Sequence, residues 1–440
     1  MKFKLTIAAM LALTGSHLSA SVATAQSDLS SAIAADYEQN LETLFKHFHA
    51  NPELSGREEK TAARLAAELR ALGFDVTTGV GGTGLVAVMK NGVGETVMLR
   101  ADMDGLPVKE NSGLVFASKA TQTEQNGEIR PVAHACGHDV HITSLIGAAR
   151  QLAARKENWK GTLVLVGQPA EELLAGARAM LEDGLYTRFP KPDYALAFHV
   201  DTGVPTGQIQ LSLAEVTSSA DTVDITVHGV GAHGASPHKG IDPILVASQI
   251  VVSLQSIVSR SIAPFEPGVI TVGSIHGGSK SNIIGDRVEL KLTVRADNPA
   301  TRKILLDGID RVAKGVAISL GVPDEKLPEV KRSATETTPA TINDRQTAEI
   351  VQKTFAQNFG KEIFYKQPRQ SMTSEDFAYF VTPEHGVKGV YFYVGGTVTD
   401  NLATAPSHHS PLFRIEHGPA IKLGTEAMVL GALSFLGVGK

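Results

Sequence analysis

The feature that most constrains the fold is an alternation of strand-like and helix-like stretches, interrupted near residue 218 by a block of different order. Residues 162–167 and 194–199 are short apolar runs that predict strands, and residues 139–154 and 172–182 carry helical spacing. Alternation of this kind predicts an α/β sheet. In such sheets, binding sites gather beyond the carboxyl ends of the strands.

The chain before this alternation carries its own turn and helix signals. Residues 84–90 and 95–100 are predicted as two strands, and Asn91-Gly92 between them is typical of a hairpin turn. A helix is predicted over residues 58–72, with Gly73 as its stop. The last helix is expected at about residues 416–436.

The interrupting block has the order β-α-β-β-α-β, which is that of a ferredoxin-like α+β unit. Its predicted elements are the strand 221–229, the helix 241–260, the strands 268–276 and 287–296, the helix 300–320 and the strand 327–331. We interpret the block as a domain inserted into the first one. The predicted boundaries are 26–216 and 333–440 for the two parts of the larger domain, and 217–332 for the insertion.

Composition sets the broad class of protein. The 440 residues are 42% hydrophobic, which is enough to bury at least one full core. Charged residues make up 20%, the formal net charge is −5, and no block of Lys and Arg occurs. A nucleic-acid partner therefore has no support.

The N-terminus has the pattern of a secretory signal peptide. Lys2 and Lys4 precede an apolar run over residues 5–13, and Ala23-Thr24-Ala25 supplies small residues for cleavage. We expect residues 1–25 to be removed and the protein to be periplasmic or secreted, although an ordinary buried first helix is the alternative. No later segment is expected to be long and apolar enough to cross a membrane.

The strongest local signal is His134-Ala135-Cys136-Gly137-His138-Asp139. Cys136 is the sole cysteine, so an internal disulfide is excluded. In an extended segment, residues two apart point the same way, and a thiolate beside an imidazole suits zinc or a similar metal. Gly137 would let the backbone turn close to an ion. A purely structural role for the pair is the alternative.

Two further predicted strands end in side chains suited to metal chemistry. Glu171-Glu172 follows the strand 162–167; one carboxylate could bind a metal while its neighbour takes a proton from water. A solvated acidic helix start explains the pair equally well. His199 ends the strand 194–199, where it is either a core residue or a site residue.

Two more candidates lie in loops. Asp102 and Asp104 follow a strand, and such carboxylates can orient a ligand histidine through its second nitrogen. An Asx-type turn is the alternative. His408-His409 precedes Ser410-Pro411 in a loop before the last helix, and histidine pairs in loops are often surface features.

Taken together, these motifs carry a family resemblance that covers nearly the whole chain after residue 25. The chain resembles the metallopeptidase superfamily of aminoacylases and zinc carboxypeptidases, and most of all its amidohydrolase branch of hippurate hydrolases and auxin-conjugate (IAA-amino acid) hydrolases. Besides the Asp102/Asp104, Cys136/His138 and Glu171-Glu172 segments, the motifs are His49-Ala50-Asn51-Pro52-Glu53-Leu54-Ser55, Phe198-His199-Val200, His233-Gly234-Ala235-Ser236-Pro237-His238, Met372-Thr373-Ser374-Glu375-Asp376-Phe377 and His409-Ser410-Pro411.

The resemblance implies two divalent metal ions per subunit. Cys136 would bridge them, where other branches use an aspartate, and Glu171 would be the general base and acid. Asp104 would orient a ligand. The remaining metal ligands would be His138, Glu172, His199 and His409. A bridging thiolate suits zinc, and manganese, nickel or cobalt fit such a mixed donor set as well.

The resemblance also assigns the inserted domain as a lid and dimerisation domain, and so implies a homodimer. His233 would help to bind the substrate carbonyl, within the chain or across the dimer, and Asn282 would contact substrate. Arg295 could pair two-pronged with a substrate carboxylate. An ion pair on a strand surface is the alternative for Arg295.

The predicted reaction is hydrolysis of an amide bond in an N-acyl amino acid or short peptide with a free carboxylate. Glu171 would take a proton from water activated by the metals, without a covalent intermediate. Two other functions stay open: a thiol hydrolase with Cys136 as nucleophile, and a non-catalytic binding protein of two lobes. Ser236 and Gly285 replace a usual methionine and proline, and the run 118–132 is long. These departures leave the acyl group and the amino acid undetermined.

Overall fold

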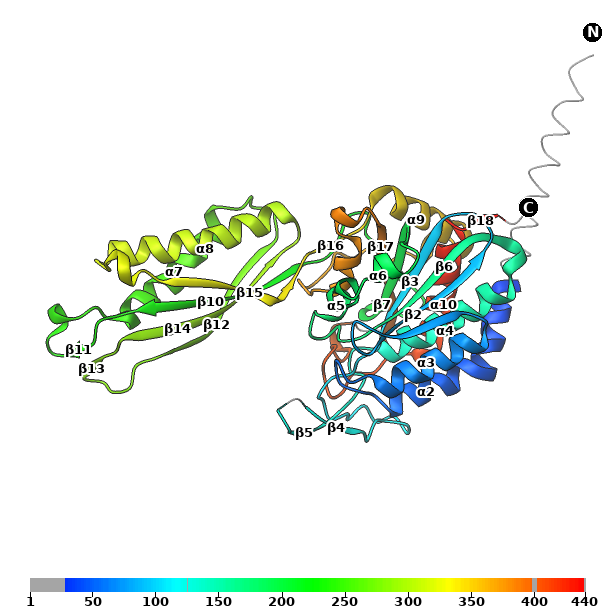
Figure 1. The fold of residues 1–440 in the computed structure, drawn as a ribbon, viewed down its shortest axis with the longest axis horizontal. Helices are drawn as coiled ribbons and strands as arrows, with labels where there is room; N and C mark the ends of the chain where they lie inside the picture. Colours follow the sequence, from blue (N-terminus) through cyan, green and yellow to red (C-terminus); the bar gives the residue numbers. More distant parts are fainter. Residues whose placement is uncertain (1–27, 125, 398–401, 439–440) are drawn as a thin grey trace, which may run out of the picture.

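The structure, a computed structural model, describes residues 28–124, 126–397 and 402–438. The predicted signal peptide, residues 1–25, lies outside the described residues. Figure 1 shows a larger α/β domain and a smaller, elongated domain that projects from it. The smaller domain is one continuous insertion in the chain, as the sequence predicts, and β16 (Thr341–Ile342) pairs with β9 (Glu215–Thr217) where the chain returns.

The larger domain is built on a mixed sheet in the order β1-β2-β6-β3-β7-β17-β8, with β18 beside β6. β3, β6, β7 and β17 run parallel, so their carboxyl ends lie at one edge. The strands are β1 (Asp75–Val80), β2 (Gly84–Asn91), β3 (Thr96–Asp102), β6 (Trp159–Gln168), β7 (Tyr194–Pro205), β8 (Ile209–Gln210), β17 (Lys388–Thr397) and β18 (Gly437–Val438).

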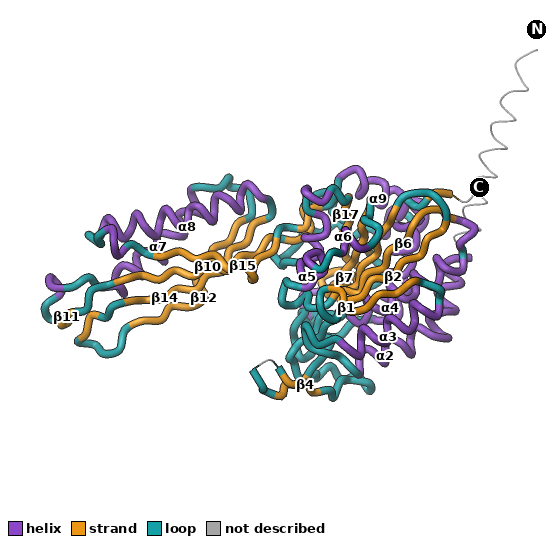
Figure 2. Tube along the Cα trace, viewed as in Figure 1, coloured by secondary structure: helices purple, strands orange, loops and turns teal. Residues whose placement is uncertain are grey.

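Helices cover both faces of this sheet (Figures 1 and 2). One face packs against α2 (Glu42–Ala50), α3 (Glu59–Ala71), α4 (His138–Ala154), α9 (Arg345–Phe359) and α10 (His417–Leu433). The other face packs against α5 (Gly176–Glu182), α6 (Leu185–Arg188) and the 3-10 helix η6 (Asp376–Val381). Because both faces are covered, the inner strands are apolar on both sides, which explains the continuous run Leu163-Val164-Leu165-Val166.

The predicted hairpin between β2 and β3 is wrong. β6 lies between these strands, antiparallel to β2 and parallel to β3. The Asn91-Gly92 turn is present, with φ of Gly92 at +86°, but it sends the chain past one strand position rather than back along its neighbour. A turn motif carries only local information, so it does not predict that β6, which begins at Trp159, will pair between the two strands.

The inserted domain has the predicted β-α-β-β-α-β order and its own core. Its antiparallel sheet has the order β12-β14-β10-β15, with α7 (Pro243–Arg260) and α8 (Pro299–Ser319) packed on it. The strands are β10 (Ser219–His228), β12 (Gly268–Gly277), β14 (Arg287–Ala296) and β15 (Glu329–Thr338), and a short pair, β11 (Ala232–His233) and β13 (Ile283–Ile284), lies at the far end (Figure 1).

Two details of this domain differ from the predictions. β15 runs to Thr338, across the boundary predicted at 332, because it pairs with β10 as far as Ala220. α7 is long and apolar enough, by length and composition alone, to cross a membrane, so the expectation that no later segment would reach that length and hydropathy is wrong. One face of α7 packs into the core of the inserted domain through Val246, Ile250 and Leu254.

Candidate active site

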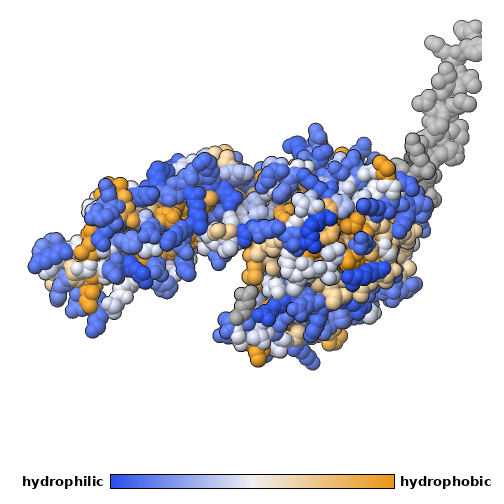
Figure 3. All heavy atoms as spheres, viewed as in Figure 1, coloured by the Kyte–Doolittle hydropathy of each residue, from blue (hydrophilic) through white to orange (hydrophobic). Residues whose placement is uncertain are grey.

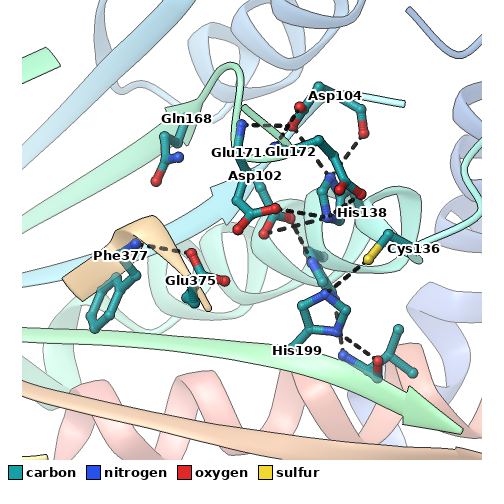
Figure 4. Close-up of polar contacts among 12 residues, drawn as sticks. Asp102, Asp104, Cys136, His138, Gln168, Glu171, Glu172, His199, Glu375 and Phe377 are labelled. Atoms are coloured by element: carbon teal, nitrogen blue, oxygen red, sulfur yellow. Dashed lines mark hydrogen bonds and ion pairs between the residues drawn. The ribbon is translucent and has the colours of Figure 1, made fainter. Parts of the chain in front are cut away.

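The carboxyl ends of β3, β6 and β7 bring acidic and histidine side chains to one edge of the larger sheet. Asp102 ends β3, and Asp104 follows it by two residues. Glu171 and Glu172 come just after β6. The prediction that His199 ends its strand is wrong, because β7 continues to Pro205 through its pairing with β17. Figure 4 shows these side chains facing one another, as expected for parallel strands whose ends share an edge.

Cys136 and His138 enter this cluster from the start of α4. The prediction that they converge through an extended segment is wrong in its geometry. Gly137 has φ +88°, so the chain bends sharply, and His138 is the first residue of the helix. A Cβ at Gly137 would lie 2.4 Å from a methyl carbon of Val200. Glycine is therefore required there both for the turn and for the close approach to β7.

Two imidazoles are oriented so that the Nε2 of each faces the cluster. Nδ1 of His138 lies 2.8 Å from the carbonyl oxygen of Asp104, and Nδ1 of His199 lies 2.7 Å from that of Val200. Each Nδ1 therefore donates a proton to its carbonyl partner, so Nε2 is the nitrogen that could bind a metal ion once it has lost its own proton. Nε2 of His138 is buried without a hydrogen-bond partner among the described residues, and Nε2 of His199 lies 3.4 Å from Sγ of Cys136.

Asp104 fixes the turn that carries the two glutamates. Its carboxylate accepts the backbone N–H groups of Glu171 and Glu172, at 3.1 and 3.0 Å. Ala170 and Leu174, on either side of the pair, have φ of +48° and +51°. Left-handed backbone costs about 1 kcal/mol or more at a residue with a side chain, and such strain gathers at functional sites. A helix was predicted over residues 172–182, but the turn occupies the first part of this range, and α5 begins only at Gly176.

His409 completes the cluster from the loop before α10. Its Nε2 lies 3.3 Å from Oε2 of Glu172, and the other oxygen of that glutamate is buried without a hydrogen-bond partner among the described residues. His409 has φ +65° and is half exposed. His408 points to β7 instead, where its Nε2 lies 3.0 Å from the carbonyl oxygen of Val200.

The donor atoms fall into overlapping groups that suit metal ions. Cys136 with His138 and His199 form one group, and Cys136 with Glu172 and His409 form another, with all donor atoms of a group within 4.8 Å of one another. Sulfur, imidazole and carboxylate donors at such spacing fit zinc and neighbouring transition metals. Nε2 of His138 and Oε1 of Glu172 would be costly to bury without a partner, and a bound metal ion would supply one.

The electrostatics of the cluster also favour bound cations. Burial, and next the charges of Glu172 and Glu171, raise the pKa of the Cys136 thiol well above its usual value. Burial followed by Glu375 and Glu172 does the same for the pKa of Glu171, and burial raises the pKa of Glu172 to about 7. Burial alone would lower the pKa of His138, but Asp102 and Asp104 raise it to about 10. The acidic groups thus disfavour one another's charged forms, and a bound cation would favour those forms.

A buried arginine network, which we did not predict, supports the edge of the sheet. Arg100 is 1% exposed and donates to Asp102 at 2.7 Å, to Glu375 at 2.8 Å and to Gln168 at 2.8 Å. Asp376 lies 3.4 Å from the same guanidinium. The available signal was an arginine inside an apolar strand, since arginine is rarely buried without acidic partners.

His141 is a second residue that we did not single out. Its Nδ1 lies 2.6 Å from Asp102, and its Nε2 accepts the backbone N–H of Val200 at 2.9 Å. Asp102 therefore orients His141 rather than a predicted ligand, and the pair ties β3, α4 and β7 together. This position one turn along α4 from His138 could have been noticed from its spacing.

A cavity of about 550 Å³ opens over the cluster, between the two domains. Besides the clustered residues, it is lined by Arg295 at the end of β14 and by the segment 371–375. The guanidinium of Arg295 donates to the hydroxyl of Ser374, and burial lowers its pKa. Arg295 is thus a wall of the same cavity, and among the described residues it makes no ion pair.

The structure does not bring His233 or Asn282 to this cavity. His233 belongs to β11, and the backbone of Asn282 accepts the N–H of Gly234 beside β13, at the end of the inserted domain farthest from the larger domain (Figure 1). Neither residue lines the cavity. Whether a second copy of the chain supplies them stays a prediction.

Comparison with known proteins identifies the family. The model of Peptidase family M20/M25/M40 matches residues 98–428. The chain belongs to this family. It is 37% identical to a hippurate hydrolase of Campylobacter jejuni over 349 residues, which cover 78% of this chain and 86% of that protein. It is 34% identical to thermostable carboxypeptidase 2 of Saccharolobus solfataricus, with 89% and 94% covered.

A solved M20 structure shares the architecture. A dinuclear metal-binding peptidase of this family from Bacillus subtilis superposes with a TM-score of 0.75 at 26% identity, covering 91% of this chain and 99% of that one. The predicted resemblance and the fold class, an α/β catalytic domain with an inserted lid domain, are confirmed. As an M20 protein the chain is a metal-dependent amidohydrolase, so the thiol-hydrolase and binding-protein alternatives are wrong.

Proposed function

We propose that this M20 enzyme hydrolyses the amide bond of N-acyl amino acids or short peptides that carry a free carboxylate. The observation that carries the proposal is Arg295, which lines one cavity together with Glu171, Glu172 and Cys136. A half-buried guanidinium without an acidic partner among the described residues suits a carboxylate of the substrate. Hippurate, the substrate named for the Campylobacter relative, is such an N-acyl amino acid.

The residues would share the work as follows. Cys136, His138, Glu172, His199 and His409 would hold two divalent cations, which lower the pKa of water and polarise a carbonyl when bound. Glu171 would take a proton from the attacking water and return it to the leaving amine. Asp104 would hold the turn of both glutamates and the ring of His138. Zinc is the first choice for a bridging thiolate, with manganese, nickel or cobalt as others.

A substrate panel combined with Arg295→Met tests the substrate class. Purified metal-loaded enzyme is given N-acyl amino acids, dipeptides and the same compounds with the carboxylate capped as an amide, and the released amine is measured. We expect hydrolysis of the free acids and a rise in their KM of about 10–100-fold in Arg295→Met, because charged hydrogen bonds contribute about 1.5–3 kcal/mol. The capped compounds should respond little to the substitution.

Arg287→Met is the matched control, since Arg287 lies at the other end of β14 and its side chain is 64% exposed. It should leave the KM unchanged. Equal hydrolysis of free and capped compounds, or an unaltered KM in Arg295→Met, would contradict the assignment of the carboxylate to Arg295. Absence of hydrolysis across the panel would contradict the substrate class itself.

Cys136→Ser tests the bridging role. A serine hydroxyl stays protonated where a thiolate can bind metal, so we expect the variant to lose metal, measured as equivalents per chain by elemental analysis. Cys136→Asp is the informative partner, because a carboxylate can still bridge two cations and should retain more metal than serine does. Equal, undiminished metal in both variants would argue that Cys136 is not a ligand.

Export and dimerisation are further parts of the proposal. The segment Lys2 to Ala25 supports export by its charge and apolar run, and the mass of the protein recovered from its native host would reveal cleavage after Ala25. The resemblance assigns His233 and Asn282 to the substrate, yet they lie at the far end of the inserted domain, which supports a homodimer in which the second chain supplies them. The mass of the particle in solution measures that state, and a monomer would remove both residues from the site.

A further inference from the structure

A second cavity, of about 650 Å³, lies beside the reaction cavity. It is formed by β8, α9 and the segment 361–369, and Tyr393 of β17 lines both cavities. The segment continues from Arg369, which lines the second cavity, to Ser371 in the wall of the first. A cavity of this size is within the range that holds a small organic molecule.

Lysine side chains form part of the wall of the second cavity. Lys353, Lys361 and Lys366 line it, and none of them forms an ion pair with a carboxylate of the described residues. Two acidic residues also line it, but Glu349 is held by Arg345 at 3.1 Å, which leaves Glu215. The local excess of positive charge runs against the net charge of −5 for the chain. Such a lining favours an anion.

Aromatic side chains supply the rest of the wall. Phe364, Tyr365 and Tyr393 line the cavity, and their rings add apolar surface to its wall. A bare inorganic anion would leave these faces unused, and an uncharged aromatic compound would leave the ammonium groups unused. The lining therefore matches a molecule that has both a carboxylate and an apolar body.

We propose that this cavity is a second ligand site, which binds an organic carboxylate with an aromatic or long acyl body. The acid released by hydrolysis of an N-acyl amino acid has this chemistry, and so has such an acid arriving from solution. Naming the released acid as a ligand depends on the proposed function. The existence of the site does not.

Two contacts connect this site to the machinery of the reaction. Tyr393 stands beside His199 across the β7–β17 pair, with ring centroids 6.5 Å apart. Arg369 donates to the carbonyl of Val216 at 2.9 Å and pairs with Asp297, where the chain passes between the two domains. A ligand in the second cavity thus lies against residues that shape the reaction cavity and the domain junction, so its binding should not simply exclude substrate.

Benzoate is the probe for this site, with acetate and benzamide as comparisons that lack the apolar body or the charge. Binding to the metal-loaded enzyme is measured by equilibrium dialysis, and inhibition is measured against an N-acetyl amino acid. We expect benzoate to bind at two sites per chain and to inhibit with a mixed pattern. Acetate and benzamide should leave the second site empty.

Two kinds of variant locate the second site. Ala356→Trp fills the cavity from α9, and Gln357→Trp is its matched control because the neighbouring Gln357 is exposed and does not line the cavity. The double variant Lys361→Glu with Lys366→Glu reverses surface charges and should fold normally. We expect Ala356→Trp and the double variant to weaken the second benzoate site at least tenfold and to make inhibition purely competitive, with turnover of the N-acetyl substrate retained.

One benzoate site in the wild-type enzyme, or two sites that neither variant weakens, would overturn the proposal. Because dialysis needs no turnover, this result is independent of whether the substrate panel succeeds. A series of acids distinguishes the two sources of ligand. The tightest acid should match the acyl group of the best substrate if the released product is the ligand, and should differ from it if the ligand comes from solution.

Discussion

Glu171→Gln should lower turnover by about 10²–10⁴-fold while leaving the metal content of the enzyme unchanged. General-base catalysis by a positioned side chain contributes rate factors of this size. An amide cannot take a proton from water, yet it keeps the shape of the carboxylate. The backbone N–H of Glu171 bonds to Asp104 independently of the side chain, so the turn should persist. Initial rates measure turnover, and elemental analysis of the same preparation measures its metal content.

Glu172→Gln is the matched control, one residue along the same strained turn. Both carboxylates are largely buried and both lie 3.9 Å from Nε2 of His138. Their further partners differ: Glu172 groups with Cys136 and His409, whereas Glu171 groups with Glu375 and Asp376. We therefore expect Glu172→Gln to lose metal. Near-normal turnover in Glu171→Gln, or the same metal loss in both variants, would refute the division of roles.

The fold could be predicted where the pattern is local. β6, α4, α7 and β14 lie within a few residues of their predicted positions, because hydrophobic periodicity reports which faces an element buries. Sheet order follows from contacts between distant segments. The β2–β3 hairpin failed for this reason, since β6 fills the position between its two strands.

The same distinction between local and distant contacts decides which site residues could be predicted. Cys136 with His138, and Glu171 with Glu172, are close in sequence and could be recognised as motifs. Arg100 and Glu375 are 275 positions apart, and nothing in the sequence around either residue indicates that the two form an ion pair. The sequence places Glu375 in a family motif but gives it no role. The structure gives it one, because its oxygens accept bonds from Arg100 and from the hydroxyl of Tyr391 at 2.6 Å.

Arg100→Met should destabilise the larger domain by about 3–5 kcal/mol, which is the usual loss when one member of a buried ion cluster is removed. Methionine fills a similar volume but leaves Asp102, Glu375 and Asp376 without their cation. These carboxylates are 3% exposed or less, so water cannot replace the lost bonds. Urea unfolding, followed by a signal from Trp159 in the core of this domain, measures the change.

Arg64→Met, in the same domain, is the control. Arg64 pairs with Glu68 at 3.0 Å on the surface of α3, where the arginine side chain is 39% exposed. Exposed pairs of this kind contribute about 0–1 kcal/mol, so the same substitution should change unfolding little. Turnover should fall in Arg100→Met beyond what unfolding explains, because Glu375 and Asp376 group with Glu171 and Asp102 orients His141. A variant as stable and as active as the wild type would mean that the three carboxylates are neutralised by protons, and that Arg100 fills space without fixing the edge of the sheet.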